Sequence, residues 1–309
     1  MDGHDNIYFV EGTSYYKESL YVVLLQQTEN NNYIYGKSKR VMDFTAGIGN
    51  RHWCVQKYLD ADSDTNSSSE PKIKKQQDKE ENQKYSSIYV QDINEFKYIR
   101  YQIQANKYEC ERWAVPAQQM DLLKLRCLTA YPNIEKDNNK DGSMHLLFAF
   151  CGPPPKLCWL HAICLFQIPN YDNKDQTSSE TKNEIVFIPI HDFTPGKFSG
   201  NSSKYSVTYI RSLDQLLIVV EGLTYLVGSN TDIKTWLKKI VQQRIENPQA
   251  TTFQNDGWFV HQLGYPQIPK KISQQVETYY AEGFCEYLNE PNTLAAIDGS
   301  SVVSLFYIG

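Results

Sequence analysis

The feature that most restricts the fold is an alternation of short apolar runs with segments of helical spacing. The strand candidates are Arg40–Phe44, Ser87–Gln91, Met144–Cys151 and Glu184–Ile190, with Ala114–Met120 as a weaker one. The helix candidates between them are His52–Leu59, Glu95–Lys107 and Lys156–Phe166. Such alternation predicts an α/β fold in which helices cover both faces of a mostly parallel sheet.

The last third of the chain is less regular. Tyr205–Arg211 and Gln215–Gly222 are candidates for the strands of an added hairpin, although the second is equally compatible with a helix. The best helix candidate is Thr231–Asn247, with Thr231 or Asp232 as its cap and Pro248 just beyond its end. Val276–Cys285 and Ser301–Gly309 predict a terminal antiparallel hairpin that closes the sheet.

The domain organisation follows from where apolar sequence is lacking. Polar, low-complexity stretches predict surface loops inserted in one domain over residues 38–309, preceded by an extension over residues 1–37. The predicted insertions are loops at about 60–86, 131–143 and 170–183 and an added segment at about 195–230.

Composition and charge exclude several classes of protein. A net charge of −5 argues against binding nucleic acid by bulk charge, although it leaves room for a local basic patch. Lys234, Lys238, Lys239 and Arg244 form such a candidate patch on one predicted helix, where a solvated face is the alternative. No apolar run is long enough to span a bilayer, so no membrane association is expected.

The cysteine pattern bears on the compartment. The seven cysteines are an odd number without a C-x-x-C pair, which indicates reduced thiols rather than a zinc site or a disulfide framework. The first residues carry acidic side chains and no apolar stretch, unlike a secretory signal. We therefore expect an intracellular protein of the nucleus or cytoplasm that holds no metal.

A glycine-containing turn follows the first strand candidate. In Val41-Met-Asp-Phe-Thr-Ala-Gly-Ile-Gly-Asn50, Gly47 and Gly49 would let the backbone approach a ligand at the end of a parallel strand. The third glycine of a dinucleotide fingerprint is replaced by His52, which disfavours NAD. The spacing from Asp43 instead fits the D-x-x-x-G-x-G turn that binds S-adenosylmethionine.

Two later acids stand where a cofactor would need them. With the polar insertion set aside, Asp92 follows Asp43 by about 20 residues, the spacing expected of a carboxylate that holds ribose hydroxyls. Asp121 stands where a third strand would end and the adenine amino group would bind. A solvated acid at a helix start is the alternative for either residue.

The fourth strand candidate ends in Gly152-Pro153-Pro154-Pro155. Methyltransferases that act on exocyclic amines of bases carry a polar residue, two prolines and an aromatic residue at this place, and they act largely by orienting the amine. Here glycine and proline replace the polar and aromatic residues. Trp159 supplies a ring from the next predicted helix or, as the alternative, packs in the core.

Taken in order, DFTAGIGN, VQDINEFKYIRYQIQANKY, AQQMD and FAFCGPPPKLCW resemble the trimethylguanosine synthase group of RNA cap methyltransferases. The resemblance implies a Rossmann-like class I methyltransferase fold and transfer of methyl from S-adenosylmethionine to the exocyclic amine of a cap guanosine, without metal. It assigns the methionine and ribose portion to Asp43, Gly47 and Gly49. It assigns the ribose to Asp92, the adenine to Asp121 and the diproline to Pro153 and Pro154.

The altered diproline turn leaves two functions open. The first is an RNA methyltransferase whose substrate is RNA, with its cap as the target. The second is a catalytically inactive methyltransferase-like subunit that scaffolds or binds RNA within a complex of protein subunits. Fold alone does not decide between them.

Overall fold

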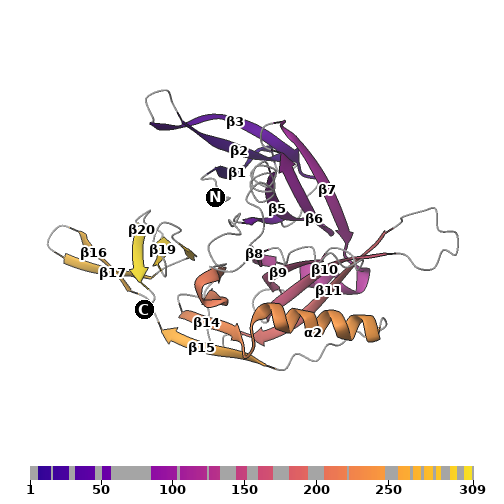
Figure 1. Cartoon of the computed structure of the whole chain (residues 1–309). Coiled ribbons are helices and arrows are strands. Elements are labelled where there is room, and N and C mark those ends of the chain that lie inside the picture. The colour runs from indigo at the N-terminus through magenta and orange to yellow at the C-terminus, as the bar shows by residue number, and fades with distance from the viewer. Residues whose placement is uncertain are drawn as a thin grey trace, which may run out of the picture. The chain divides into compact units, whose positions relative to one another are not determined.

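Figure 1 shows the computed structural model of the chain. The described residues are 6–14, 17–27, 32–45, 51–56, 85–102, 105–123, 125–132, 144–151, 159–169, 181–193, 205–220, 223–247, 257–264, 267–272, 275–280, 283–286, 293–297 and 303–307. They form two compact units, Met1–Leu123 with Ile168–Glu184, and Lys124–Gln167 with Ile185–Gly309. We call these unit 1 and unit 2.

The described elements are antiparallel sheets in which strands adjacent in the sequence are neighbours in space. The first sheet is β1 (Ile7–Ser14), β2 (Lys17–Gln27) and β3 (Tyr33–Asp43). The second is β4 (Arg51–Gln56), β5 (Tyr85–Asp92), β6 (Glu95–Gln102) and β7 (Lys107–Ala114), followed by the 3-10 helix η1 (Ala117–Leu123). The third is β8 (Leu125–Ala130), β9 (Met144–Cys151), β10 (Trp159–Pro169) and β11 (Thr181–Asp192).

The remaining elements follow the same rule. A fourth sheet is formed by β12 (Tyr205–Ile210), β13 (Gln215–Val220), β14 (Leu223–Ser229) and β15 (Trp258–Gly264). The 3-10 helix η2 (Arg211–Leu213) links β12 to β13, and the helix α2 (Ile233–Glu246) lies between β14 and β15 in the sequence. A hairpin of β16 (Gln267–Ile272) and β17 (Gln275–Tyr280) follows. The last sheet is β18 (Gly283–Glu286), β19 (Thr293–Ile297) and β20 (Val303–Tyr307).

This architecture overturns the α/β prediction. The fold is not a Rossmann-like class I methyltransferase fold, because its pairings are antiparallel and α2 is the single α-helix among the described residues. The three helices predicted at His52–Leu59, Glu95–Lys107 and Lys156–Phe166 were wrong. These segments overlap the strands β4, β6 and β10 instead. The assignment to the trimethylguanosine synthase group, which rested on the resemblance of short sequence segments, was therefore wrong.

The terminal hairpin predicted from Val276–Cys285 and Ser301–Gly309 was also wrong. The first of these segments contains parts of β17 and β18, and β17 pairs with β16. Strand β19 lies between β18 and β20, so the two predicted partners are separated by a further strand.

Residues Glu95–Gln102 show why the helical interpretation failed. Phe96 and Ile99 are three residues apart, which is a helical interval. However, all four residues of Phe96–Ile99 are buried, so both faces of this segment are covered, as in a strand inside the fold. The deciding constraint is the two-residue link after Asp92, which pairs Asp92 directly with Glu95. A link this short joins antiparallel strands and cannot serve a parallel crossover.

Other sequence predictions were confirmed. The strands predicted at Ser87–Gln91, Met144–Cys151 and Glu184–Ile190 lie in β5, β9 and β11. The strand predicted at Arg40–Phe44 lies in β3 except for its last residue. The predicted hairpin of β12 and β13 is antiparallel, with Tyr205 opposite Val220. Helix α2 begins after Asp232, whose carboxylate accepts a hydrogen bond from the Thr235 backbone N–H at 2.6 Å.

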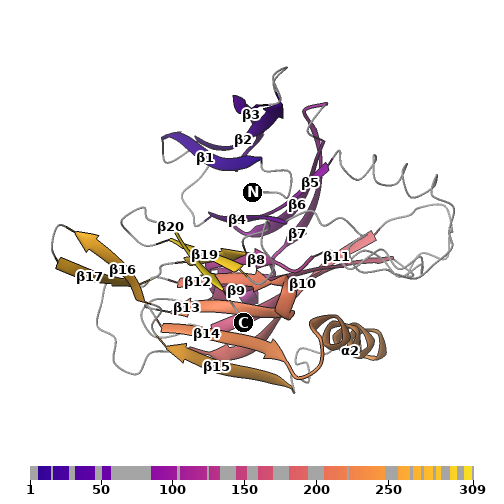
Figure 2. The same ribbon diagram turned by 60° about the vertical axis from the view of Figure 1, so that its left-hand side comes forward.

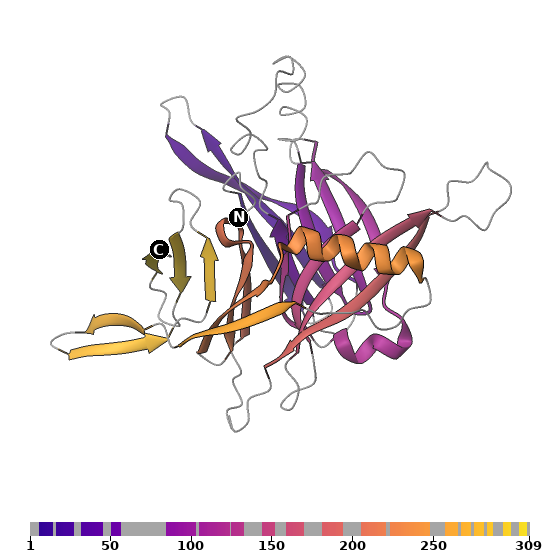
Figure 3. The same ribbon diagram turned by 60° about the horizontal axis from the view of Figure 1, so that its bottom comes forward.

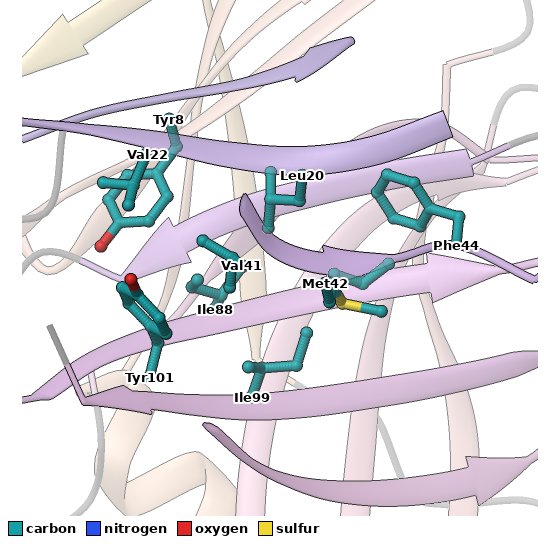
Figure 4. Packing of buried hydrophobic residues seen from close by; sticks show 10 residues of the cluster. Tyr8, Leu20, Val22, Val41, Met42, Phe44, Ile88, Ile99 and Tyr101 are labelled. Atoms are coloured by element: carbon teal, nitrogen blue, oxygen red, sulfur yellow. The ribbon is translucent and has the colours of Figure 1, made fainter. Parts of the chain in front are cut away.

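Unit 1 is a two-layer structure in which the β1–β3 sheet packs on the β4–β7 sheet. Its core is formed by the buried side chains of Tyr8, Leu20, Val22, Val41, Met42, Phe44, Ile88, Val90, Ile99 and Tyr101 (Figure 4). Each sheet thus buries one apolar face against the other, which is the arrangement that removes most apolar area from water.

Unit 2 brings the first strands of successive meanders together. Strand β12 lies beside β8 (Figure 2) and also contacts β18. Each meander therefore places its first strand next to the first strand of the neighbouring meander, an arrangement that the blades of β-propellers share. Helix α2 lies beside β14, and the Trp236 ring on α2 meets the Trp258 ring on β15 edge to face at 5.1 Å.

The predicted insertions and the predicted N-terminal extension can be compared only in part with the structure. The loops predicted at 60–86, 131–143 and 170–183 and the segment at 195–230 lie largely or partly outside the described residues. The extension predicted over residues 1–37 contains β1, β2 and the beginning of β3. Among the described helices, none has the length and apolar character that crossing a membrane would require.

We expect Ile99→Ala to lower the free energy of unfolding of unit 1 by about 2–5 kcal/mol, because Ile99 is fully buried between the two sheets. The matched variant Ile34→Ala removes the same atoms from a side chain that is 53% exposed, and it should change stability by less than about 0.5 kcal/mol. Urea unfolding followed by circular dichroism measures both. Equal losses would contradict the two-layer core.

Candidate functional site

A buried charged pair ends the apolar face of the β5–β6 hairpin. Val90 lies opposite Lys97 and Ile88 opposite Ile99, so these four side chains share the face that packs on the β1–β3 sheet. Asp92 lies two residues beyond Val90 on the same face. The apolar stripe therefore leads directly to Asp92 and Lys97.

Asp92 is enclosed by donors. Its Oδ2 accepts hydrogen bonds from the Thr45 backbone N–H at 2.9 Å, from Thr45 Oγ1 at 2.7 Å and from Lys97 Nζ at 2.5 Å. Lys97 Nζ also donates to Thr45 Oγ1 at 3.3 Å. Asp92 is fully buried and Lys97 is 3% exposed, so the pair is shielded from solvent.

A second layer of charge extends this pair towards the surface. Glu95 Oε1 lies 2.9 Å from Lys97 Nζ and 3.8 Å from Arg112 Nη1. Glu95 is the residue paired with Asp92 across the turn, and Arg112 lies on β7 beside β6. The charges alternate from Asp92 to Arg112, which compensates the buried ammonium on both sides.

The turn beside the pair is strained. Ile93 has a φ of +58°, a conformation that a β-branched side chain disfavours. Gln91 holds the turn because its Nε2 donates to the Ile93 carbonyl at 3.0 Å. Asn94 holds it from the other side, since its carbonyl accepts from the Val115 backbone N–H at 3.0 Å.

The pKa shifts agree with an ionised pair. Burial by itself raises the pKa of Asp92, but the hydrogen bonds from Lys97 and Thr45 outweigh it and lower that pKa below 3.8. Burial by itself lowers the pKa of Lys97, but hydrogen bonds to Asp92 and Glu95 outweigh it and raise that pKa above 10.5. At neutral pH both groups carry charge.

This arrangement is suited to joining sheets. The Asp92 carboxylate is bonded to a residue at the end of β3 and to a residue on β6, so it ties the two layers of unit 1 together. A carboxylate enclosed in this way lies away from solvent and from incoming reactants. Among the described residues no group of three or more His, Cys, Asp or Glu side chains is placed to hold a metal.

The structure separates the residues predicted to bind the cofactor. Asp43 is exposed at the end of β3, where its Oδ1 accepts from Ser19 Oγ at 2.6 Å and lies 3.3 Å from Arg40 Nη1. Asp92 is buried as described, and Asp121 lies in η1. Gly47 and Gly49 lie outside the described residues.

The predicted catalytic residues are not brought together either. Pro153 and Pro154 lie outside the described residues. Trp159 begins strand β10, half-buried opposite Cys151, with its ring 6.4 Å from that of His161. Binding of S-adenosylmethionine stays an untested prediction, and its premise was a parallel sheet whose strand ends meet at one edge.

Sequence reasoning missed Lys97 and Thr45. It placed Lys97 on a helix and Thr45 in a ligand-binding turn. The alternation Lys97, Ile99, Tyr101 on one face was the available signal, because it becomes a core-facing stripe once the segment is treated as a strand. The link between the end of β3 and Asp92 joins residues 47 positions apart and has no local signal.

Comparisons with protein-family models, with curated proteins and with solved structures found no match. The function of the protein is therefore inferred from the geometry of its described residues.

We expect Lys97→Met to destabilise unit 1 by about 3–5 kcal/mol, because it leaves the Asp92 carboxylate buried without its ammonium partner. Adding Asp92→Leu to this variant should restore most of that loss by replacing the pair with apolar groups. Urea unfolding measures the two variants, and Lys107→Met on the exposed start of β7 is the control. No rescue in the double variant would contradict the assignment.

The pair also predicts a dependence of stability on pH. Because folding lowers the pKa of Asp92, its contribution is complete above the unfolded value near 3.8 and is lost as the pH falls through the folded pKa. Because folding raises the pKa of Lys97, its contribution is complete below 10.5 and is lost as the pH rises further. Asp92→Asn should flatten the acid limb of a melting-temperature profile, and an acid limb as steep as that of the wild type would contradict the assignment.

Proposed function

We propose that the protein is an interaction scaffold that binds a partner protein through the free end of the β2–β3 ribbon. The observation that carries the proposal is the exposure of two large apolar side chains, Ile34 and Tyr35, at consecutive positions of β3. The proposal keeps the scaffold role that the sequence offered as its second function, without the methyltransferase fold.

The ribbon extends past its own sheet. Strand β1 pairs with β2 only as far as Ile7 opposite Val23, whereas β2 and β3 continue together to Gln27 opposite Tyr33 (Figure 1). Beyond Val23 the described part of this sheet therefore has two strands. A two-stranded ribbon is marginally stable in water unless a further surface packs against it.

Each face of this ribbon end carries a half-exposed apolar side chain, although Leu24 at its base packs against the core of unit 1. Successive strand residues point to opposite faces, yet Ile34 is 53% and Tyr35 is 49% exposed. Ile7, at the end of β1, is a third exposed apolar side chain of the same sheet. Burial against a partner would gain about 25 cal/mol for each Å² of apolar area removed from water.

The contact is expected through the faces of the ribbon rather than its edge. The register between β2 and β3 shifts between Val23 and Leu25, which marks a bulge, and Lys37 and Arg40 follow on the edge strand. Bulges and charged side chains prevent a free edge from pairing with another strand. Side-chain contact at Ile34 and Tyr35 remains unobstructed by these devices.

Strand β7 provides an internal comparison. It carries Tyr108, which is also 49% exposed, but Tyr108 has Lys107 and Glu109 on either side. The carbonyl of Arg112 on this strand accepts a hydrogen bond from Asn183 Nδ2 at 2.6 Å, so part of its edge is covered. An isolated tyrosine among charges is ordinary surface, whereas adjacent apolar residues mark a contact site.

We expect a photo-crosslinking amino acid at position 35 to capture one defined protein in cells that produce this chain. The same amino acid at position 108 is the matched control and should capture no such protein. Ile34→Asp should reduce the crosslink about tenfold while leaving the urea unfolding midpoint unchanged. Equal capture from both positions, or capture of RNA alone from position 35, would contradict the proposal.

A further inference from the structure

Helix α2 has one face anchored in unit 2. Ile233, Trp236, Leu237 and Ile240 are each at most 2% exposed, which places the apolar stripe of the helix against its own unit. Figure 3 shows α2 in orange as a straight helix that is in view along its whole length. This packing holds the opposite face in a defined orientation.

The opposite face is basic. Lys234, Lys238 and Lys239 are exposed, and their spacing of four and one places their ammonium groups along one side of the helix. With Arg244 and Glu246 the helix carries four basic side chains and one acidic side chain, a net charge of +3, in a chain of net charge −5. Among the described residues these three lysines form no ion pair.

The carboxylates near the helix are already engaged. Asp232 accepts from the Thr235 backbone N–H and from Thr235 Oγ1, both at 2.6 Å, and these bonds, with a smaller contribution from Lys238, lower its pKa. Asp214 accepts from the Ile233 backbone N–H at 2.8 Å and from the Tyr209 hydroxyl at 2.9 Å.

At the other end of α2, Glu246 accepts from Gln242 Nε2 at 2.7 Å. These acids therefore serve mainly as caps and as a hydrogen-bond acceptor within unit 2, and among them only Asp232 attracts a lysine of this face, through the small contribution of Lys238.

We propose that the face formed by Lys234, Lys238 and Lys239 binds a carboxylate-rich segment of a partner protein. Lysine ammonium groups are compact, mobile point charges that suit separate carboxylates on an extended segment. Sites for single-stranded RNA combine cations with exposed aromatic rings, but the aromatic residue of this helix, Trp236, is buried. The lysine face uses residues of unit 2 and is independent of the ribbon end in unit 1.

The test is fluorescence anisotropy of the full chain with a labelled glutamate homopolymer at low ionic strength. The triple variant Lys234→Gln, Lys238→Gln, Lys239→Gln should bind about tenfold more weakly than the wild type. The control is Lys37→Gln, Lys107→Gln, Arg40→Gln, which removes the same charge from exposed positions of unit 1 and should bind as the wild type does. Added salt should weaken wild-type binding, because exposed charges are screened.

Three outcomes would overturn the proposal. An equal loss in the control variant would mean that the attraction is spread over the surface. Tighter binding of labelled oligouridylate than of the glutamate homopolymer would mean that the face selects RNA. Unchanged glutamate binding in the triple variant, with helix content confirmed by circular dichroism, would mean that the face binds no acidic segment.

Discussion

Antiparallel pairing between strands adjacent in the sequence is the constraint on which the rest of this structure depends. Each described sheet follows chain order, from β1–β3 to β18–β20, so each strand pairs its backbone groups with strands that are its neighbours in the sequence. Short links such as Ile93–Asn94 then set the register, and the register decides which residues share a face. A single meander leaves both faces exposed until something covers them, which is why the β1–β3 and β4–β7 sheets pack together. In unit 2 the first strands β8 and β18 each contact β12.

The Asp92–Lys97 pair shows what that geometry does to charged residues. Cross-strand pairing places both side chains at the end of an apolar stripe, where an unpaired charge would cost several kcal/mol. Thr45 and Glu95 supply the remaining partners, and Ile93 adopts a strained φ within the same turn. These bonds link the end of β3 to the β5–β6 hairpin. The buried charged pair thus holds the two layers of unit 1 together.

The two surfaces proposed for binding arise where local structure is complete but its outer face is not covered. At the ribbon end, β2 and β3 extend beyond the last residue of β1 that pairs with β2. Ile34 and Tyr35 are therefore exposed although both residues pair with β2. On α2, the apolar stripe is buried and the lysines remain outside. One surface is apolar and the other is cationic, and they belong to different units. A scaffold with two such surfaces would recognise two chemically distinct segments.

Elements with local signals could be predicted from the amino-acid sequence. Met144–Cys151 is apolar except for His145 and forms a buried strand, and the cap at Asp232 and the stripe through Trp236 and Ile240 define α2. The hairpin of β12 and β13 was also predicted, although its second strand was equally compatible with a helix in the sequence alone. The tertiary structure alone decided whether Glu95–Gln102 is a helix or a strand and which residue meets Asp92. Phe96 and Ile99 fit either period, and the choice between periods is made by the partner strands β5 and β7 and by the covering β1–β3 sheet, whose contacts come from distant parts of the chain.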